Sequence, residues 1–347
     1  MVITKEQVLE ALSQVQEPEL HRDLVTLKMI QDLQIKTDMV SFKIILTTPA
    51  CPLRARIESE ARAAVMTIPG VKKVDVQFGS SVPSDARIKT KLELPIRNAI
   101  AVGSGKGGVG KSTVAVNMAV ALAQMGATVG LLDADIYGPN IPTMMGVKHL
   151  PAPKDQKMIP AMAHGVKMMS IGFLVKPGQA MIWRGPMLHS AISQFLRDVE
   201  WGALDYLIID LPPGTGDAQI SLAQTIPLSG GVIVTLPQKV STEDAARAVE
   251  MYRALQVPVL GIIENMSYLE LPDGQRMEVF GAGGGEALAA SANVPFLGKI
   301  PMLAEVREGV DNGEPIVESH PQSTAAQALI GISQLVAARM SMVSLQV

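Results

Sequence analysis

The chain of 347 residues is long enough for two domains, or for one large domain with an appendage. Hydrophobic residues make up 48% of it and aromatic residues 3%, a composition that suits helices packed on a parallel sheet. The formal net charge of −3 at pH 7 gives no electrostatic case for binding nucleic acid or an anionic membrane.

Residues 1–80 are predicted to form a small α+β domain, and the polar, proline-bracketed stretch 81–97 is predicted to be a linker. Charges in residues 1–12 argue against a signal peptide, and we expect no apolar run of the chain to span a membrane. The expected elements are a helix over 4–15 with Thr4 as its N-cap, strands over 33–37 and 40–47, a helix over 53–66 and a strand over 71–78.

The single cysteine of the chain, Cys51, lies between two prolines at the expected start of a helix. The helix dipole can lower the pKa of a thiol in this position and make it reactive, whereas a lone cysteine is more often an inert small apolar residue. One cysteine excludes an internal disulfide and predicts a reducing, cytoplasmic location.

Residues 98–347 are predicted to form an α/β domain with a mostly parallel sheet and helices on both faces, because apolar strands alternate with helical segments. In such sheets, ligands bind at the carboxyl ends of the strands. The expected strands cover 99–102, 129–133, 206–210, 231–235, 259–263 and 296–300, and the expected helices cover 114–125, 187–198, 217–224, 242–255, 285–292 and 323–340.

A glycine-rich loop joins the first of these strands to the first helix, and Gly105–Ser112 matches the phosphate-binding pattern G-x-x-x-x-G-K-[ST]. The same glycines also fit a dinucleotide-binding G-x-G-x-x-G loop, with Asp133 at about the spacing of a ribose-binding acid. Lys111 and Ser112 favour a nucleoside triphosphate, since a dinucleotide loop needs no lysine aimed at a terminal phosphate. The residues expected to bind the phosphates are Gly105, Lys106, Gly107, Gly108, Val109, Gly110, Lys111, Ser112 and Thr113.

Lys106 is a second lysine in this loop and departs from a plain phosphate loop. It is either a solvated loop residue or a residue that reaches across a dimer interface to the nucleotide of a neighbour. In the second case it offsets the charge that develops on the transferred phosphoryl group, as an arginine finger does.

Three aspartates stand at or just past the ends of expected strands: Asp133, Asp135 and Asp210. Asp210 ends an apolar strand, as in the second magnesium motif of nucleotide-binding proteins, and is expected to hold a magnesium-bound water beside Ser112. Asp133 and Asp135 share a face of an extended segment, so one can approach magnesium while the other orients the attacking water. The alternative is that one of the three caps a turn.

The chain contains 20 methionines and 5 histidines. We interpret the methionine clusters, among them 144–145 and 168–169, as flexible core filler rather than a surface groove. The histidines show no mutual metal-ligand spacing.

Residues 105–113 resemble the deviant Walker A motif of the MinD/ParA/nitrogenase-iron-protein class, with Lys106 as the signature lysine. Further motifs resemble the Mrp/ApbC family of ATP-dependent iron–sulfur cluster carriers, and the motif at 47–52 resembles the small iron–sulfur-assembly domain often fused ahead of such ATPases. The resemblance covers nearly the whole chain. The motifs that carry it lie at 133–140, 183–187, 205–217 and 264–268.

The resemblance implies a cytoplasmic homodimer with two ATP sites at its interface, Mg²⁺ as cofactor, and delivery of iron–sulfur clusters to apoproteins or exchange with assembly factors. From the charge and the segment 323–347, we expect no nucleic acid and no membrane as partners. The implied catalytic residues are Lys106, Lys111 and Asp135, the magnesium residues are Ser112, Asp133 and Asp210, and Asn265 recognises adenine.

One departure from the family concerns the cluster itself. A Cys-x-x-Cys pair usually follows the Asn-Met-Ser-Tyr motif, but residues 267–281 contain no cysteine, and thiolates are the usual cluster ligands. Three options remain: the dimer holds a cluster through Cys51 of each chain, a partner holds it, or the ATPase serves another assembly task.

Two other classes of protein remain as alternatives: a MinD- or ParA-like positioning ATPase, and a nucleotide-gated scaffold that binds no cluster. The segment 323–347 has one basic residue, Arg339, which disfavours a membrane-docking helix. The near-neutral charge argues against DNA.

Overall fold

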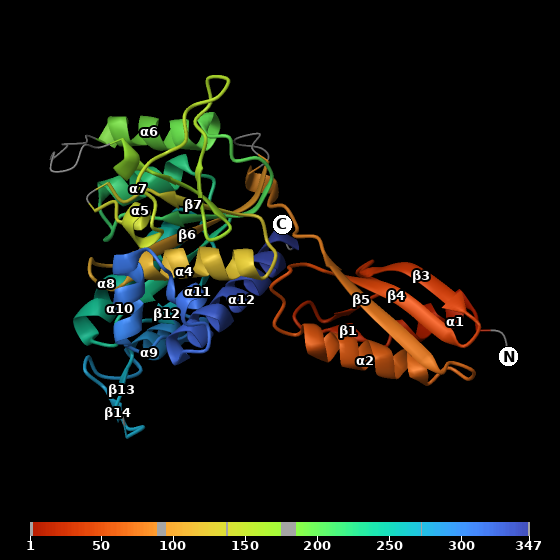
Figure 1. The fold of residues 1–347 in the computed structure, drawn as a ribbon. Helices are drawn as coiled ribbons and strands as arrows, with labels where there is room; N and C mark the ends of the chain where they lie inside the picture. Colours follow the sequence, from red (N-terminus) through yellow and green to blue (C-terminus); the bar gives the residue numbers. More distant parts are fainter. Residues whose placement is uncertain (1–2, 89–94, 137, 175–184, 272, 346–347) are drawn as a thin grey trace. The chain divides into compact units, whose positions relative to one another are not determined.

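The computed structural model describes residues 3–88, 95–136, 138–174, 185–271 and 273–345. The chain divides into two compact units (Figure 1). Of the described residues, one unit comprises those up to Pro83 together with 337–345, and the other comprises Ser84–Val336. Segments from both halves of the sequence therefore belong to the N-terminal unit.

The N-terminal unit contains a three-stranded sheet in the order β3-β4-β5, formed by Ile30–Lys36, Met39–Leu46 and Lys73–Ser80. Strands β3 and β4 pair antiparallel, and β4 and β5 pair parallel. The unit also has two helices, α1 (Lys5–Leu12) and α2 (Arg54–Met66), and a small antiparallel pair, β1 (Gln16–Glu17) and β2 (Arg22–Asp23).

The start of α1 follows from its sequence. Thr4 caps the helix as predicted: its side chain accepts a hydrogen bond from the Gln7 N–H, and the Gln7 side chain accepts one from the Thr4 N–H. The core of the unit forms because burial alternates along β4 and recurs every third or fourth residue on both helices. It includes Val8, Leu12, Val40, Phe42, Ile44, Leu46, Ile57, Ala61 and Val65.

The second unit is built on an eight-stranded sheet with the order β15-β12-β11-β6-β10-β7-β9-β8. Seven strands run parallel and β8 pairs antiparallel with β9, so the predicted mostly parallel sheet is confirmed. The strands are β6 (Ile96–Ser104), β7 (Val129–Asp133), β8 (Ala161–Ala163), β9 (Val166–Ser170), β10 (Leu204–Asp210), β11 (Gly230–Thr235), β12 (Val259–Glu264) and β15 (Phe296–Lys299).

Helices cover this sheet, and the central strands β7 and β11 are buried along their whole length (Figure 1). A short hairpin of β13 (Leu269–Glu270) and β14 (Arg276–Met277) follows β12. The helical segments are α4 (Lys111–Gln124), α5 (Ile141–Met144), η1 (Ile171–Phe173), α6 (Gly185–Asp198), α7 (Asp217–Thr225), α8 (Lys239–Ala254), α9 (Gly284–Ser291), α10 (Ala304–Asn312), α11 (Ile316–Ser319) and α12 (Thr324–Leu345).

The edge strand β8 and its neighbour β9 were not predicted from the sequence. Met168 and Met169 lie on β9 and are fully buried, which fits the interpretation of this methionine cluster as core filler. Met162 on β8 is 61% exposed. A short strand with methionines instead of β-branched residues gives little periodic signal, and this is why it was missed.

Part of the predicted linker packs into the second unit. Asp85 and Ile88 are buried there, and the Asp85 carboxylate forms an ion pair with the Arg87 guanidinium at 2.7 Å. Arg87 also donates to the Ser229 carbonyl at 2.9 Å, next to the start of β11. The polar, proline-bracketed composition predicted a linker, but a paired charge is compatible with burial in the second unit.

Helix α12 corrects the expectation that no apolar run is long enough to span a membrane. Among the described helices it alone has the length and composition to do so, with a mean hydropathy of 1.5 over its most apolar window. Half of that window is buried inside the protein, as in a core helix.

Candidate functional site

The glycine loop lies between the end of β6 and the start of α4, as predicted. Gly108 and Gly110 adopt φ angles of 78° and 84°, a left-handed conformation that glycine adopts without strain, and Gly110 caps α4. A Cβ on Gly105 would lie 2.1 Å from the backbone carbon of Asp244, so the loop packs directly on the backbone of α8. The loop presents backbone N–H groups and a helix N-terminus to an anion.

A pocket of about 320 Å³ lies over this loop. Most of the predicted phosphate-binding residues line it, whereas Gly105 and Val109 do not. Gly138, Asn140 and Met144 close it from the segment that follows β7, and Pro213 closes it from the segment that follows β10. The lining residues are Ser104, Lys106, Gly107, Gly108, Gly110, Lys111, Ser112, Thr113, Asp135, Gly138, Asn140, Met144 and Pro213.

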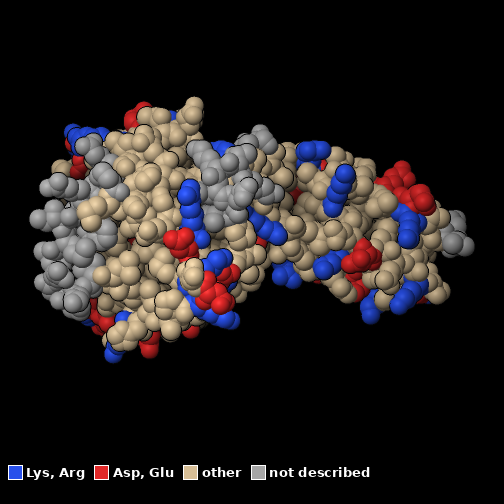
Figure 2. Space-filling model, turned by 90° about the horizontal axis from the view of Figure 1, so that it is seen from above, with Lys and Arg blue, Asp and Glu red and all other residues tan. Residues whose placement is uncertain are grey.

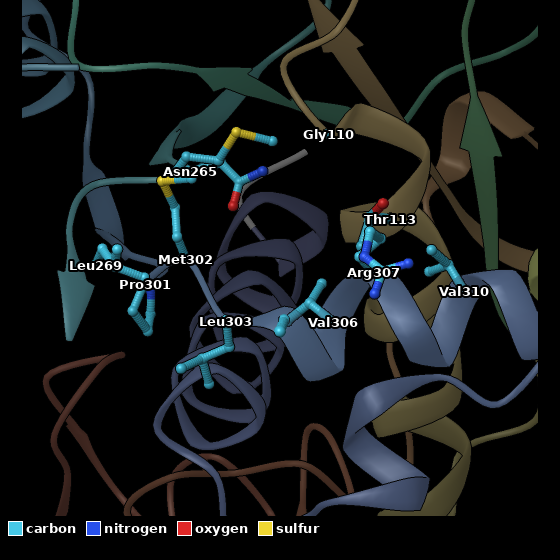
Figure 3. Close-up of a pocket in the computed structure, with 12 residues that line it drawn as sticks. Gly110, Thr113, Asn265, Leu269, Pro301, Met302, Leu303, Val306, Arg307 and Val310 are labelled. Carbon is cyan, nitrogen blue, oxygen red and sulfur yellow. The ribbon is translucent and has the colours of Figure 1, made fainter. Parts of the chain in front are cut away.

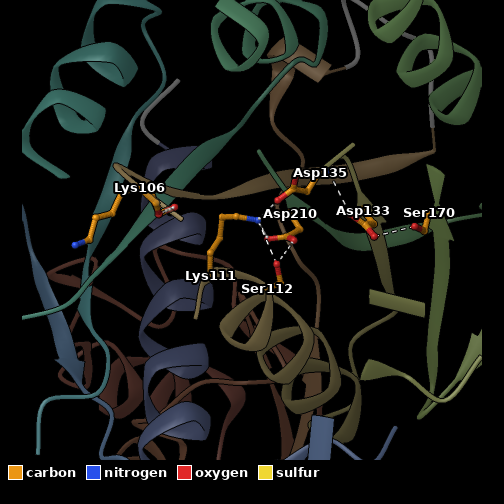
Figure 4. Close-up of polar contacts among 8 residues, drawn as sticks. Lys106, Lys111, Ser112, Asp133, Asp135, Ser170 and Asp210 are labelled. Atoms are coloured by element: carbon orange, nitrogen blue, oxygen red, sulfur yellow. Dashed lines mark hydrogen bonds and ion pairs between the residues drawn. The ribbon is translucent and has the colours of Figure 1, made fainter. Parts of the chain in front are cut away.

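Lys111 connects the groups at the base of this pocket (Figure 4). Its ammonium lies 2.7 Å from Asp210 Oδ1, 3.5 Å from Asp135 Oδ2 and 3.3 Å from Ser112 Oγ. The side chain is buried, so these interactions are strong. A phosphate in the pocket would compete with the two carboxylates for the lysine.

Ser112 and Asp210 form the pair predicted for magnesium. The Ser112 hydroxyl donates to Asp210 Oδ2 at 2.6 Å, and Asp210 is buried at the end of β10. Burial raises the pKa of the Asp210 carboxyl, and the adjacent Lys111 opposes that change. Hydroxyl and carboxylate oxygens fit Mg²⁺, which takes oxygen ligands. Asp210 itself does not line the pocket, whereas its hydrogen-bond partners Ser112 and Lys111 do.

Asp135 is the carboxylate that does line the pocket. Its Oδ1 atom is buried and has no hydrogen-bond partner within the described part of the chain. A buried acceptor without a donor is unfavourable, so the atom is ready to accept a hydrogen bond from a water or ligand. This is the property required of a residue that orients an attacking water.

Asp133 does not take the position expected of a magnesium ligand. Both of its carboxylate oxygens are engaged: Oδ2 accepts from Ser170 Oγ at 2.8 Å, and Oδ1 accepts from the Asp135 N–H at 3.1 Å. Asp133 is fully buried and does not line the pocket. Burial raises the pKa of its carboxyl to about 8, and the charge of Asp210 adds to the effect. The geometry thus favours a supporting role over metal binding.

Lys106 lines the pocket rim, but its side chain extends away from Lys111 and the carboxylates (Figure 4). Its carbonyl accepts a hydrogen bond from Ser104 Oγ at 2.9 Å, which fixes the backbone of the loop there. The ammonium is therefore not directed into the phosphate pocket of its own chain.

A second pocket of about 430 Å³ adjoins the loop at Gly110 and Thr113 (Figure 3). Asn265, just past β12, lies at this pocket and donates from Nδ2 to the Val109 carbonyl at 2.8 Å. The bond fixes the amide so that Oδ1 is left to accept a hydrogen bond. The other lining residues are Met266, Leu269, Pro301, Met302, Leu303, Ala304, Val306, Arg307 and Val310.

The sequence analysis missed most of this second pocket. Its apolar wall comes from α10 and the segment before it, where Val306 and Val310 stand four residues apart and share a face of the helix. That spacing was the available signal. A mostly apolar pocket beside a phosphate loop suits a nucleotide base.

Burial supports the interpretation of Cys51 as an inert small residue over that of a thiol with a lowered pKa. Burial raises the pKa of the thiol to about 11, and the charges of Glu19 and Glu17 add to the effect. Helix α2 begins only at Arg54. Across the described residues, no group of three or more His, Cys, Asp and Glu side chains is arranged to hold a metal ion.

The phosphate loop at the carboxyl edge of a mostly parallel sheet, with Lys111, Ser112 and Asp210 at its base, defines a P-loop NTPase. Residues 95–337 match the ParA family described as NUBPL iron-transfer P-loop NTPase, and residues 5–78 match the family described as iron-sulfur cluster assembly protein. The chain belongs to the family of NUBPL-type iron-transfer P-loop NTPases.

Relatives resemble this chain over nearly its whole length. A Synechocystis protein named iron-sulfur cluster carrier protein is 52% identical over 99% of this chain and 100% of its own. An Escherichia coli protein of the same name is 40% identical, over 96% of this chain and 91% of its own. The rice protein named Fe-S cluster assembly factor HCF101, chloroplastic, is 43% identical over 93% of this chain and 62% of its own.

Solved structures resemble the second unit. A nucleotide-binding protein from Archaeoglobus fulgidus in complex with ADP matches with a TM-score of 0.58 and 40% identity, over 66% of this chain and 91% of its own. The cell-division ATPase MinD from Pyrococcus furiosus matches with a TM-score of 0.54 and 22% identity, over 69% of this chain and 98% of its own, which shows a shared fold.

Proposed function

We propose that this chain is an ATP-hydrolysing carrier or assembly factor that delivers iron–sulfur clusters to apoproteins, acting as a cytoplasmic homodimer with Mg²⁺. The arrangement of Lys111, Ser112, Asp210 and Asp135 around one phosphate pocket carries the nucleotide part of the proposal. The cluster part rests on the names of relatives as similar as 52% over nearly the whole chain.

Adenine is the base that the second pocket suits best. Asn265 has its Nδ2 occupied by the Val109 carbonyl, so its free Oδ1 faces a ligand as an acceptor. The exocyclic amino group of adenine donates to such an atom, whereas the carbonyl at the same position of guanine would repel it.

The reaction assigns one task to each residue at the phosphate pocket. Lys111 moves from Asp210 and Asp135 toward the terminal phosphates. Ser112 and Asp210 would hold Mg²⁺, which would neutralise phosphate charge. Asp135 Oδ1 accepts a hydrogen bond from the attacking water and orients it. Within one chain, these tasks fall to side chains that already lie next to one another at the phosphate pocket.

Phosphate release measured with Mg²⁺-ATP tests this part. The wild type should hydrolyse ATP, and Lys111→Ala should remove the activity because the terminal phosphates lose their cation. If both proteins release equal and negligible amounts of phosphate, the proposal of an ATPase is contradicted, and the nucleotide-gated scaffold is favoured.

We propose that Lys106 of one chain acts on the nucleotide bound by a second copy of the chain. The Lys106 ammonium points away from its own carboxylate cluster, which supports the alternative of a lysine that acts on the nucleotide of a neighbour. Lys106→Ala should abolish hydrolysis but keep nucleotide binding, because the loop backbone remains. Hydrolysis at the wild-type rate in this variant would exclude the role.

The cluster would be held without the usual cysteine pair. The strands β13 (Leu269–Glu270) and β14 (Arg276–Met277) pair in that region instead, and the Arg276 guanidinium lies 4.2 Å from the ring centre of Tyr268. Cys51 is the one thiol of the chain, and its raised pKa means that a metal must displace a tightly held proton. A cluster held by a partner is therefore the option that we favour.

Anaerobic reconstitution with iron and sulfide separates the options. We expect no thiolate–iron absorption from the chain alone, in the wild type or in Cys51→Ser. Absorption in the wild type that Cys51→Ser loses would assign the cluster to Cys51 and contradict our preference.

We propose neither nucleic acid nor membrane as a partner. Figure 2 shows Lys and Arg side chains interspersed with Asp and Glu over the visible face, with no broad basic patch among the described residues drawn there. Nucleic-acid and anionic-membrane binding both depend on clustered positive charge.

A further inference from the structure

We propose that Ser170 is a positioning residue for the proposed catalytic Asp135, and that it acts through Asp133. This inference rests on the proposed function, since it assumes that Asp135 orients the attacking water. The hydrogen-bond chain that connects the three residues is drawn in Figure 4.

The chain of hydrogen bonds starts at the edge of the sheet. The Gly172 N–H donates to Ser170 Oγ at 2.9 Å, and the Ser170 hydroxyl donates to Asp133 Oδ2 at 2.8 Å. Asp133 Oδ1 then accepts the Asp135 N–H at 3.1 Å. Ser170 and Asp133 are directly paired neighbours where β9 and β7 end, and both are fully buried.

The same segment is fixed from its other side. The Ala134 N–H donates to the carbonyl of Asp210 at 3.0 Å, so the peptide after Asp133 is anchored to β10. The Asp133 side chain is thus bonded to Ser170 on β9, and the next residue, Ala134, is bonded to Asp210 on β10. The backbone at Asp135 has little freedom as a result.

The side chain of Asp135 depends on this backbone. Its Oδ2 lies 3.5 Å from the Lys111 ammonium, and its Oδ1 has no partner within the described chain. When Lys111 turns to a phosphate, the hydrogen bond from the Asp135 N–H to Asp133 still holds the backbone that orients the Asp135 carboxylate. A displacement of about 1 Å at a reacting group can lower a rate by roughly 10²-fold.

A purely structural role is the competing explanation, because a buried carboxylate needs hydrogen bonds wherever it lies. The two explanations differ in what a variant changes. A structural role lowers the stability of the whole unit, whereas a positioning role lowers kcat without a matching loss in ATP binding.

The test uses three variants of the full-length chain. Ser170→Ala removes the donor to Asp133, Ser170→Thr restores a hydroxyl, and Ser229→Ala is the matched control. Ser229 is as deeply buried, and its hydroxyl accepts the Ala99 N–H at 3.0 Å outside both pockets. Thermal unfolding of each variant measures the structural cost.

We expect Ser170→Ala to lower kcat by about 10-fold or more with KM for ATP within about 2-fold, and Ser170→Thr to recover most of the loss. Ser229→Ala should lose stability but keep kcat. Wild-type kcat in Ser170→Ala would overturn the inference, as would an equal kcat loss in Ser229→Ala.

A second measurement does not depend on turnover. Amide hydrogen exchange at Asp135 should become about 10-fold faster or more in Ser170→Ala and stay unchanged in Ser229→Ala. Unchanged exchange in Ser170→Ala would overturn the inference even in an active enzyme. If the wild type hydrolyses no ATP, the proposed function fails, and exchange at Asp135 still decides whether Ser170 holds the segment.

Discussion

At the scale of single residues, three carboxyl groups lie close to a single lysine beneath the phosphate pocket. Lys111 is shared by Asp210 and Asp135, and Asp133 lies directly behind them. One lysine does not balance these carboxylates when they are ionised, so a divalent cation completes the site better than a bare nucleotide does. This imbalance explains why we expect Mg²⁺-ATP as the ligand.

The contact between Asn265 and the glycine loop leads to a prediction about base selectivity. Asn265→Ala removes the acceptor that faces the base and the donor to the Val109 carbonyl. We expect ATP affinity to fall by about 10-fold and the preference for ATP over GTP to shrink with it. Titration of both nucleotides measures the change, and an unaltered ratio would contradict the assigned contact.

The raised pKa of Cys51 predicts slow alkylation. Burial favours the neutral thiol, so the folded pKa of about 11 lies above the ordinary value of 9.0 and the thiolate fraction grows only as pH approaches 11. At pH 8 the folded protein should react with iodoacetamide about 100-fold more slowly than the unfolded chain. Since Cys51 is the one cysteine, mass spectrometry of the intact protein follows the reaction directly.

At the scale of elements, the glycine loop packs closely on α8, so the loss of stability caused by a Gly→Ala substitution should depend on its position in the loop. A methyl group at Gly105 would meet the backbone of Asp244 at 2.1 Å, whereas one at Gly107 would meet only the ring of Pro213 at 3.9 Å. Gly105→Ala should therefore destabilise the unit by about 2 kcal/mol or more, and Gly107→Ala should cost well under that. Thermal unfolding of the two variants compares them, and equal losses would show that α8 gives way.

Sequence patterns predicted the elements that carry strong, local signals. The strand–loop–helix around Lys111 was predicted because its glycines and apolar flanks are specific, and buried parallel strands such as β11 are continuous apolar runs. The edge pair β8 and β9 and helix α10 were missed, since short or weakly periodic segments are defined by what they pack against.

Within the site, residue types were easier to predict than their tasks. Strand ends placed Asp133, Asp135 and Asp210 together, but the sequence does not show which carboxylate faces the pocket. The hydrogen bond from Ser170 holds the Asp133 carboxylate away from the pocket. Ser170 lies 37 residues from Asp133, on a strand that was not predicted. Contacts of this kind depend on sheet order, which a local pattern does not contain.

At the scale of the whole molecule, the end of the chain completes the N-terminal unit. Ala337, Met340 and Ser341 are buried, and the Ser341 hydroxyl donates to the Thr47 carbonyl at 3.2 Å. A chain that ends at Val336 should lose about 3 kcal/mol or more of stability in this unit, because buried side chains are deleted. Hydrogen exchange in β4 and α2 measures the loss.

The control for that truncation is a chain that ends at Ser344. It removes Leu345, which is 49% exposed, and the residues after it, and should leave exchange in β4 unchanged. Equal protection in both truncated chains would mean that the N-terminal unit is complete without the last turns of α12.

Residues far apart in the sequence complete the N-terminal unit, and this has a consequence for synthesis on the ribosome. The first 83 residues emerge early, but the residues that complete their unit emerge about 250 residues later. At roughly 5–20 residues per second, the N-terminal unit waits tens of seconds for its last helical turns. The N-terminal unit therefore becomes complete only when nearly the whole chain has been made, at about the same time as the second unit.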